Sequence, residues 1–293
     1  MKTVLLTGAT GFLGSHLARY IVSKGYKVAI FKRSSSDVHR IVDLLGVLSA
    51  YDSDTGDLTR PFEELGRIDA IVHTATCYGR QGESADDIFN ANTVFPLHVL
   101  ELAIRNKVET FINTDTALDN DVNTYALSKR QFAEWGKHLS KAGRIRFLNL
   151  KVEHFYGPLD DPSKFTTHVV RSCLDNVPTL KLTAGEQQRD FIYIDDVVLA
   201  YGSLLKHSER LTKGFVEYGV GSGQAIRVRD FVETVHRLTS SCTRLEFGAI
   251  PYRANEVMYC CTDTSELRAL GWAPCIDLAE GIRMTIEREK GLQ

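Results

Sequence analysis

The first half of the chain alternates short apolar runs with longer segments that have helical periodicity. Six apolar runs have the length of buried strands: 3–7, 27–31, 47–51, 69–75, 110–114 and 146–151. Helical patterns follow several of them, at 12–24, 85–106 and 125–142. Strands that alternate with helices predict a parallel sheet with helices on both faces. We therefore expect an α/β fold with a doubly wound, Rossmann-type parallel sheet.

Two features qualify this pattern. Pro96 lies inside the helical segment 85–106, where we expect the helix to break or bend. The second half of the chain has shorter, mixed elements and no clean linker, which indicates a smaller C-terminal lobe interleaved with the sheet domain. The pair Asp195 and Asp196 marks the start of a helix, because acidic residues complement the helix dipole there.

Composition excludes several classes of protein. The chain has 293 residues, 43% of them hydrophobic and 25% charged, with a formal net charge of -2. This balance gives no reason to expect binding to nucleic acid or to a membrane surface. No apolar run approaches the ~20 residues of a membrane span, and the start of the chain lacks a signal-peptide pattern. The six cysteines match no zinc spacing, so we expect reduced thiols, a cytoplasmic location and no metal.

The segment "LTGATGFLG" carries the first candidate chemistry. Gly8, Gly11 and Gly14 lie between the first predicted strand and the first predicted helix. Glycine permits a tight turn and a close approach of the backbone to a pyrophosphate, which then faces the helix N-terminus. A structural glycine turn is the alternative. In this context we predict a dinucleotide site contacted by Gly8, Thr10, Gly11, Phe12, Leu13 and Gly14.

The end of the second predicted strand bears on which dinucleotide binds. An NAD site usually has an acidic residue there to accept the ribose hydroxyls. This chain has "FKRSSS", with Lys32, Arg33 and Ser34 in that place. A guanidinium suits a 2′-phosphate, so we predict NADP(H) rather than NAD(H). In the alternative, the basic turn is solvated and Asp37 serves the ribose of NAD.

Tyr125 precedes Lys129 by four residues in a predicted helix. Residues four apart lie on one helix face, so a phenol and an ammonium can enter one site. Free tyrosine has a pKa near 10, and a nearby positive charge favours the phenolate. The pair is therefore a candidate for proton transfer. The same spacing also arises by chance in surface helices.

Together, the glycine loop and the Tyr-x-x-x-Lys pair resemble the extended short-chain dehydrogenase/reductase family, whose members act mostly on nucleotide sugars. The resemblance covers almost the whole chain. It implies that Tyr125 donates a proton to a ketone oxygen and that Lys129 also holds the nicotinamide ribose. Further motifs imply cofactor contacts: "GDLTR" places Asp57 and Leu58 at the adenine, and "HTAT" places Thr74 and Ala75 along the cofactor.

Other motifs of the family imply substrate contacts. "FYGPLDD" resembles the Tyr-Gly-Pro turn, with Tyr156 near the substrate. The segments "QQRDFIYIDD" and "PYRANEV" resemble those whose arginines, here Arg189 and Arg253, reach a nucleotide diphosphate. Asn255 replaces the usual glycine of the second segment. The sugar pocket of the family corresponds to Cys77, Tyr78 and Arg80.

The family also places a serine or threonine beside the reacting oxygen. In "FINTDTAL" the position falls on Thr116, with Thr114 as the second choice and as a substrate contact. The alternative for both is a loop threonine that satisfies its own backbone. His73, at a strand end, is expected in the core or the cofactor wall.

The resemblance assigns residues 1–155 to the NADP(H)-binding Rossmann domain and residues 156–293 mainly to a substrate-binding lobe. Dehydratases of the family need a glutamate that is absent here. Within the family, "NTDT" and "HTATCYGR" resemble the CDP-abequose and CDP-paratose synthase group. We therefore expect NADPH-dependent reduction of the 4-keto group of a nucleotide-linked deoxyhexulose, in a homodimer paired through the helices at 85–106 and 125–142. An NAD-dependent 4-epimerase and a non-catalytic NADP-binding regulator are the alternatives.

Overall fold

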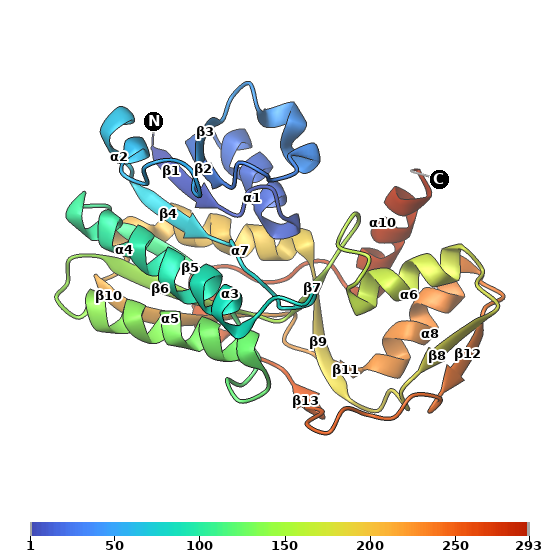
Figure 1. Ribbon diagram of the computed structural model, residues 1–293. Helices are drawn as coiled ribbons and strands as arrows, with labels where there is room; N and C mark the ends of the chain where they lie inside the picture. Colours follow the sequence, from blue (N-terminus) through green and yellow to red (C-terminus); the bar gives the residue numbers. More distant parts are fainter. Residues whose placement is uncertain (1, 292–293) are drawn as a thin grey trace. The chain divides into compact units, whose positions relative to one another are not determined.

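The computed structural model describes residues 2–291, which fall into two compact units (Figure 1). The sheet unit comprises residues 1–151 and 198–218 of the chain, and the C-terminal unit comprises 152–197 and 219–293. The division falls at residue 151, and the segment 198–218 returns to the sheet unit.

A seven-stranded sheet organises the sheet unit, in the order β10-β6-β5-β4-β1-β2-β3. Its strands are β1 (Thr3–Thr7), β2 (Lys27–Lys32), β3 (Ser49–Asp52), β4 (Ala70–His73), β5 (Thr110–Thr116), β6 (Arg146–Val152) and β10 (Gly214–Val220). All five residues of β1 are buried, as expected for a central strand covered on both faces. Strands β2 and β4 flank β1 in parallel register. The order reverses at β1, which confirms the predicted doubly wound α/β fold and places the ligand-binding edge at the carboxyl ends of β1 and β4.

The helical elements of this unit are α1 (Phe12–Ser23), η1 (His39–Leu44), α2 (Arg60–Glu64), α3 (Ala85–Phe89), η2 (Asn90–Val94), α4 (Phe95–Arg105), α5 (Thr124–Ser140), η3 (Ser208–Arg210) and α7 (Ile194–His207), whose start, up to residue 197, belongs to the C-terminal unit. Helices α4 and α5 cover one face of the sheet, through a core that includes Val99, Phe132 and Phe147 (Figure 1). The predicted break at Pro96 is confirmed. A π-helical turn, η2, separates α3 from α4, and Pro96 lies in the first turn of α4.

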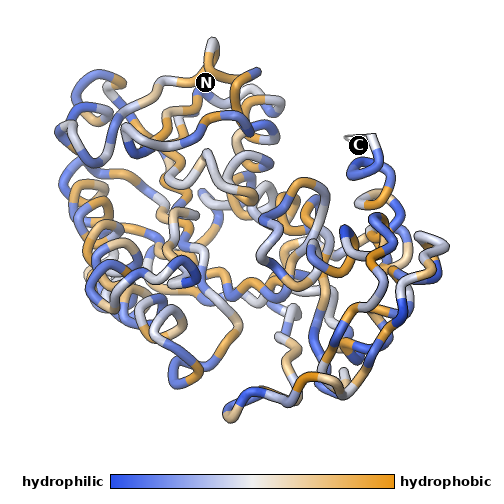
Figure 2. Tube along the Cα trace, turned by 45° about the vertical axis from the view of Figure 1, so that its right-hand side comes forward, coloured by the Kyte–Doolittle hydropathy of each residue, from blue (hydrophilic) through white to orange (hydrophobic). Residues whose placement is uncertain are grey.

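The C-terminal unit is built around β9. Its strands are β7 (His154–Tyr156), β8 (Thr179–Leu182), β9 (Gln188–Tyr193), β11 (Ala225–Arg227), β12 (Arg244–Phe247) and β13 (Tyr259–Cys260), and its helices are α6 (Phe165–Leu174), α8 (Val228–Thr239), α9 (Ser265–Ala269) and α10 (Leu278–Lys290). Strands β7, β11 and β13 all pair with β9. Figure 2 shows that polar and apolar residues alternate along the chain, as expected for helices and strands with one buried face.

Asp195 and Asp196 lie in the first turn of α7, as predicted. Asp196 has an additional role, because its carboxylate accepts hydrogen bonds from the amides of Cys275 and Ile276, both at 3.0 Å. The indole N–H of Trp272 donates to the Asp196 carbonyl oxygen at 3.0 Å. These bonds attach the segment before α10 to the start of α7.

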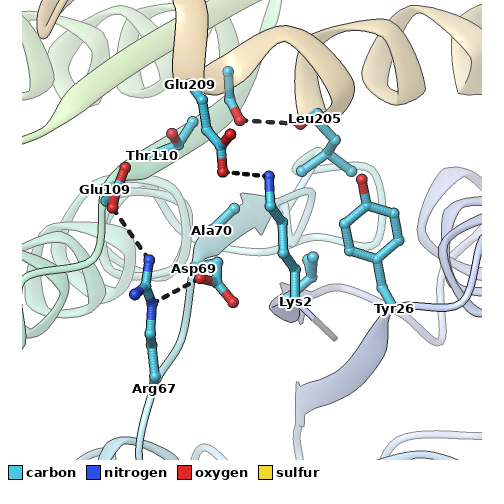
Figure 3. Close-up of a pocket in the computed structure, with 11 residues that line it drawn as sticks. Lys2, Tyr26, Arg67, Asp69, Ala70, Glu109, Thr110, Leu205 and Glu209 are labelled. Atoms are coloured by element: carbon cyan, nitrogen blue, oxygen red, sulfur yellow. Dashed lines mark hydrogen bonds and ion pairs between the residues drawn. The ribbon is translucent and has the colours of Figure 1, made fainter.

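A network of ion pairs closes the amino-terminal edge of the sheet (Figure 3). Lys2 pairs with Glu209 at 2.6 Å, and Arg67 pairs with Asp69 at 2.8 Å and with Glu109 at 3.2 Å. They surround a cavity of about 20 Å³, which has room for about one water molecule. Arg146 also pairs with Glu109 at 3.2 Å, so three cations balance three carboxylates at this edge, which lies opposite the carboxyl ends of the strands. Among residues 2–291, no helix is both long and apolar enough to cross a lipid bilayer.

Candidate active site

The glycine loop joins β1 to α1 at the carboxyl edge of the sheet. Gly8 has φ = 73°, and a Cβ atom there would lie 2.5 Å from the amide nitrogen of Ala75. A Cβ atom on Gly14 would overlap the carbonyl oxygen of Gly8. Gly11 is the exposed N-cap of α1, and no side chain caps the helix there. The loop thus presents backbone amides at an uncapped helix N-terminus, a favourable place for a phosphate.

The side chains of Thr7 and His73 help to hold this loop in place. The Thr7 hydroxyl oxygen accepts hydrogen bonds from the amides of Thr74 and Ala75, both at 3.2 Å, so it donates its proton to His73 Nδ1, 2.7 Å away. Burial holds the pKa of His73 well below its usual range, so the ring is neutral. The pair attaches Thr74 and Ala75 to the glycine turn, and His73 lies in the core, as expected.

The predicted 2′-phosphate residues have different surroundings. Lys32 pairs with Asp52, and the amide and hydroxyl of Ser34 both donate to Asp54 at 2.8 Å. The Asp37 carboxylate, the alternative ribose ligand, accepts from the amide and ring of His39. By contrast, Arg33 is exposed and its guanidinium has no hydrogen bond or ion pair with any residue in the range 2–291. Arg33 is therefore the cation available to a ligand.

The predicted adenine residues follow β3. The Asp57 carboxylate accepts a hydrogen bond from the Thr59 amide at 2.8 Å, which shapes the turn before α2. Leu58 packs against the core of the sheet unit. Both residues border an open groove that is also lined by His98, Glu101, Leu102 and Arg105 of α4.

Tyr125 and Lys129 occupy the first two turns of α5. The helix begins at Asn123, whose side chain accepts a hydrogen bond from the Ala126 amide at 2.8 Å. The side chain of Thr116 is close enough to the Tyr125 hydroxyl to act as its hydrogen-bond partner and lower its pKa. Lys129 is 1% exposed and has no hydrogen bond or ion pair within the described part of the chain. The structure therefore brings together the three predicted catalytic residues and leaves a buried ammonium that no described protein group hydrogen-bonds.

The hydrogen bond to Tyr125 distinguishes the two candidate threonines. The hydroxyl of Thr114 lies 2.6 Å from the hydroxyl of Tyr201 in α7 and is occupied there. Thr116 is the threonine that contacts the phenol. The geometry favours Thr116 as the catalytic choice and gives Thr114 a packing partner instead.

The electrostatics of the pair differ from the sequence expectation. Burial raises the pKa of Tyr125 well above 10, and Tyr78 and Asp115 raise it further, whereas the hydrogen bond from Thr116 opposes them. Burial lowers the pKa of Lys129 to about 8, against an opposing effect of Asp115. A lowered tyrosine pKa was expected, but in the protein alone desolvation outweighs the opposing effects of Thr116 and of the Arg80 charge. The phenol is thus held protonated, which is the form that donates a proton.

The low pKa of Lys129 has a consequence for stability. The folded value is about 8 and the unfolded value is 10.5, so between these pH values the unfolded chain binds more protons and the contribution of Lys129 to stability rises with pH. Each pH unit in this window changes the free energy of unfolding by about 1.4 kcal/mol, so the contribution of Lys129 rises by roughly 3 kcal/mol across it. In denaturant titrations from pH 8 to 10.5, the free energy of unfolding of the wild type should therefore rise relative to that of Lys129→Met.

Lys137 provides the control for this measurement. It is exposed on the same helix, so its ammonium is solvated in both states. Lys137→Met should leave the pH dependence of the wild type in place. If Lys129→Met and the wild type changed in parallel with pH, Lys129 would not be the buried ammonium described here.

Asn92 is a site residue that sequence reasoning missed. It is buried in the π turn η2. Its side chain accepts a hydrogen bond from the Cys77 amide at 2.7 Å and donates one to the Cys77 carbonyl oxygen at 2.8 Å. Its Nδ2 also donates to Ser128 Oγ in α5 at 3.0 Å. Asn92 thus fixes the loop after β4 to the helix that carries Tyr125. In the sequence, the predicted helix break near Pro96 was the feature that pointed to this segment.

The loop after β4 brings two predicted pocket residues to the phenol. The ring of Tyr78 lies 5.0 Å from the ring of Tyr125, tilted by 36°, and the Arg80 guanidinium lies 4.9 Å from the Tyr78 ring. The Cys77 thiol interacts with Glu83, and burial raises its pKa. Tyr78 and Arg80 therefore form an exposed stack beside Tyr125, whereas Cys77 contributes mainly through its backbone.

The remaining predicted substrate residues belong to the C-terminal unit. Arg189 is largely buried, and its guanidinium donates to Glu256 at 2.5 Å and to the Gln188 carbonyl at 2.8 Å. Arg253 is exposed. Tyr156 is buried, and its hydroxyl donates to the Leu278 carbonyl at 3.2 Å. These contacts give Tyr156 a packing role, and its position does not support the predicted substrate contact.

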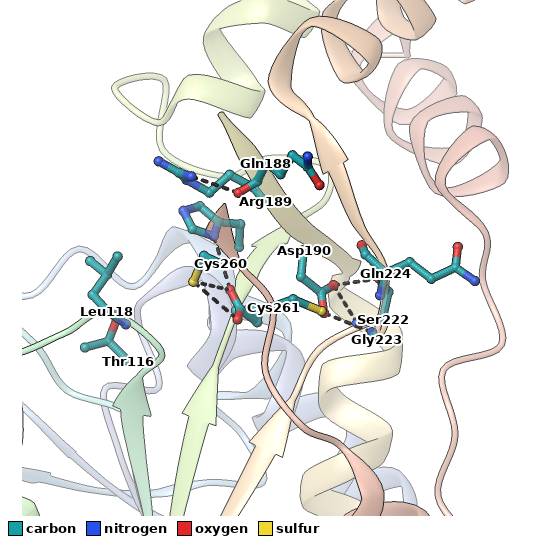
Figure 4. A network of polar contacts seen from close by, with 12 residues as sticks. Thr116, Leu118, Gln188, Arg189, Asp190, Ser222, Gly223, Gln224, Cys260 and Cys261 are labelled. Atoms are coloured by element: carbon teal, nitrogen blue, oxygen red, sulfur yellow. Dashed lines mark hydrogen bonds and ion pairs between the residues drawn. The ribbon is translucent and has the colours of Figure 1, made fainter. Parts of the chain in front are cut away.

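Two buried carboxylates are Asp190, which follows Arg189 in β9 (Figure 4), and Glu153, which precedes β7. Asp190 accepts from the amides of Ser222 and Gly223 at 2.7 and 2.9 Å and so shapes the loop before β11. The thiol of Cys260 donates to Glu153 at 3.3 Å, and that of Cys261 to Asp190 at 3.7 Å. The adjacent cysteines thus each donate to one of these two carboxylates.

Comparisons with known proteins agree with this geometry. The model of the NAD dependent epimerase/dehydratase family matches residues 4–221. The chain is 34% identical to a CDP-abequose synthase of Salmonella typhimurium, with 97% of both chains covered, and 31% identical to a CDP-abequose synthase of Salmonella muenchen, with 99% and 98% covered. Among solved structures, UDP-glucose 4-epimerases from Thermotoga maritima, with UDP-glucose, and from Thermus thermophilus, with NAD, each have a TM-score of 0.85. These two are 21% and 22% identical over 99% of this chain and 100% of theirs, which shows a shared fold.

Proposed function

The chain belongs to the NAD dependent epimerase/dehydratase family, within the extended short-chain dehydrogenase/reductases, and on this premise we propose that it reduces the 4-keto group of a nucleotide-linked deoxyhexulose with NADPH. Membership makes it an NAD(P)-dependent oxidoreductase that acts on nucleotide sugars. The reaction direction, the cofactor phosphate and the sugar are the proposed parts. The proposed proton transfer rests on one observation: Tyr125 and its partner Thr116 lie beside a buried lysine that no described protein group hydrogen-bonds.

The residues present fit a nicotinamide dinucleotide. Side chains are excluded at Gly8 and Gly14, and the N-terminus of α1 has no side-chain cap, so backbone amides are free for the pyrophosphate. Lys129 would hold the nicotinamide ribose, and Asp57 and Leu58 would meet the adenine. Thr74 and Ala75 would line the cofactor from the loop after β4. When bound, the cofactor supplies the hydride.

The protein itself supplies the proton. Tyr125 is held protonated by burial, and Thr116 orients its hydroxyl by the hydrogen bond they share. Proton donation by Tyr125 to a ketone oxygen is then general acid catalysis. The sequence Thr114-Asp115-Thr116 lacks the glutamate that dehydration requires, which supports reduction.

The stack beside Tyr125 supports a deoxygenated sugar. The Tyr78 ring offers an apolar face next to the proton donor, and a sugar carbon without a hydroxyl can pack there without leaving a buried polar group unsatisfied. The Arg80 guanidinium lies 4.9 Å from the centre of that ring. We assign Arg189 and Arg253 to the nucleotide diphosphate, where charged hydrogen bonds contribute roughly 1.5–3 kcal/mol each. The CDP-abequose synthases of Salmonella support a CDP-linked 3,6-dideoxyhexulose as the substrate.

We also assign the protein a homodimeric state. Three large apolar side chains, Phe89, Leu127 and Trp135, are exposed on α3 and α5. Exposed apolar groups of this size on neighbouring helices are typical of subunit contacts. Light scattering of the purified protein would test this assignment.

The proposed reaction has a direct test. Purified protein is incubated with NADPH and a panel of nucleotide 4-ketosugars, and the loss of NADPH absorbance is followed together with the mass of the sugar product. We expect oxidation of NADPH with a product two mass units heavier than the ketosugar. Tightly bound oxidised NAD with interconversion of hydroxyl epimers and no NADPH oxidation would instead identify a 4-epimerase. Binding without either reaction would identify a regulator.

Arg33→Ala should raise the Michaelis constant for NADPH and leave that for NADH nearly unchanged. Arg33 is the one cation at the end of β2 that is exposed and without an ion pair in the described range, so the 2′-phosphate depends on it. Loss of a charged hydrogen bond predicts an increase of about tenfold or more. Arg40→Ala is a control on the following segment. Tighter binding of NADH than NADPH by the unaltered protein would refute the assignment of Arg33.

A further inference from the structure

Asp115 is a buried carboxylate that the proposed reaction does not use. It lies in β5 between the two threonines and is 4% exposed. Its Oδ1 accepts from the Thr116 amide at 2.8 Å, and its Oδ2 accepts from Asn149 Nδ2 at 2.9 Å. Both donors are neutral, and the carboxylate forms no ion pair with any residue from 2 to 291. A buried charge that is only hydrogen-bonded is costly unless an opposite charge lies near.

The strand and helix geometry identifies that opposite charge. Side chains alternate along a strand, so Asp115 shares a face of β5 with Phe111. Phe111 packs against Phe132 of α5, with ring centroids 5.8 Å apart, so this face lies under α5. Lys129 is three residues before Phe132, on the same side of the helix, and it interacts electrostatically with Asp115. The two charges thus face each other from β5 and α5.

Hydrogen bonds from side-chain amides hold the Asp115 carboxylate in this position. Asn149, in β6, is completely buried; its Oδ1 accepts from Asn113 Nδ2 at 2.7 Å while its Nδ2 donates to Asp115. The same Nδ2 donates to Glu217 of β10 at 3.0 Å, and Glu217 is neutralised by Lys151 at 2.8 Å. The carboxylate is therefore held by groups that carry no net charge.

We propose that Asp115 is the internal counter-charge of Lys129, a positioning residue that keeps the active-site lysine protonated at neutral pH. The charge pairing is a property of the protein alone, and only its catalytic consequence rests on the proposed function. Other titratable groups face this pair: His73 from β4, Tyr125 from α5, Tyr201 from α7 and Glu217 from β10. His73 is neutral, Tyr125 and Tyr201 are held protonated by burial, and Glu217 has its own lysine. Asp115 is thus the carboxylate available to Lys129.

The test measures the lysine directly, in the full chain without cofactor. Lysine is labelled with ¹³C and ¹⁵N, and the side-chain NMR signal of Lys129 is assigned by its absence from Lys129→Met. In Asp115→Asn, which keeps the size of the side chain, the titration midpoint of Lys129 should fall by about one pH unit or more. Equal midpoints in the wild type and D115N would overturn the proposal.

Asn149→Ala is the matched control. It removes the amide that hydrogen-bonds Asp115 but keeps the charge at position 115. The protein should therefore lose stability, while the titration midpoint of Lys129 changes less than in D115N. A midpoint that falls equally far in both variants would also overturn the proposal, since altered packing would then explain the effect. If D115N does not fold, Asp115→Ser removes the same charge and leaves room for water.

The catalytic consequence is measured separately. In D115N the alkaline limb of kcat/KM for NADPH-dependent ketoreduction should move to lower pH by the same amount as the lysine midpoint. Absence of ketoreduction in the wild type would reject the proposed function and leave the NMR result intact. Ketoreduction with an unchanged alkaline limb in D115N would reject the role of Asp115 and leave the proposed function intact.

Discussion

Tyr125→Phe should fold, bind NADPH and lose hydride transfer by about two to four orders of magnitude, the usual scale for a general acid. The substitution keeps the ring that stacks on Tyr78 and removes only the hydroxyl that bonds Thr116. The informative measurement is single-turnover oxidation of NADPH with a nucleotide 4-ketosugar, with folding checked by circular dichroism. Near-normal transfer in a folded Tyr125→Phe protein would remove Tyr125 from the chemistry.

The two threonines supply graded controls for this result. Thr116→Val removes the partner of the phenol and should slow transfer, by less than Tyr125→Phe does. Thr114→Val removes a partner of Tyr201 and should have a smaller effect still. The reverse order of the two threonine variants would show that the register chosen for the active-site loop is wrong.

Gly14→Ala should abolish dinucleotide binding and destabilise the protein by about 3 kcal/mol, the upper part of the range for overpacked sites. Alanine normally stabilises a helix relative to glycine, so the expected sign is unusual. The reason is that the added methyl group meets only backbone atoms, of Gly8 and Ala9, which cannot rotate away. The start of α1 would have to move off the glycine turn and would take its amides with it.

The measurement is denaturant unfolding together with a fluorescence titration of NADPH. Gly46→Ala is the matched control, because nothing lies within 4 Å of a Cβ atom built there and its backbone has no positive φ. This control should stay within about 0.5 kcal/mol of the wild type and bind NADPH normally. A stable, cofactor-binding Gly14→Ala protein would show that the close approach of α1 to β1 is dispensable.

Much of the sheet unit could be predicted because its strands are buried on both faces. The runs that begin at Thr3, Lys27 and Thr110 lack the alternation of half-exposed strands, and each starts a strand in the structure. The C-terminal unit was harder to predict. Its strands are as short as β13, which has two residues, and they pair through contacts distant in sequence, such as β7 with β9. Periodicity carries little information over such lengths.

The site could be predicted where chemistry fixes a local spacing and not where tertiary contacts decide. The i, i+4 relation of Tyr125 and Lys129 is local, and so is the glycine triplet. The choice of Thr116 over Thr114 depends on Tyr201 in α7, which no local pattern identifies. Two further contacts also depend on the packing of strands and helices. Asn92 hydrogen-bonds Cys77, and Asp115 interacts with Lys129. The sequence did not reveal that burial raises the pKa of Tyr125 in the protein alone.

The order in which the chain supplies its strands constrains how the protein is made. Strand β6 ends at Val152, but its outer neighbour β10 begins only at Gly214. During synthesis at 5–20 residues per second, β6 therefore remains an unprotected edge for on the order of several seconds while the intervening segment is translated. An open edge of this kind is a template for association with other chains. A fragment that stops at residue 151 would keep that edge permanently, so we expect it to associate unless it is expressed with the segment that completes its sheet.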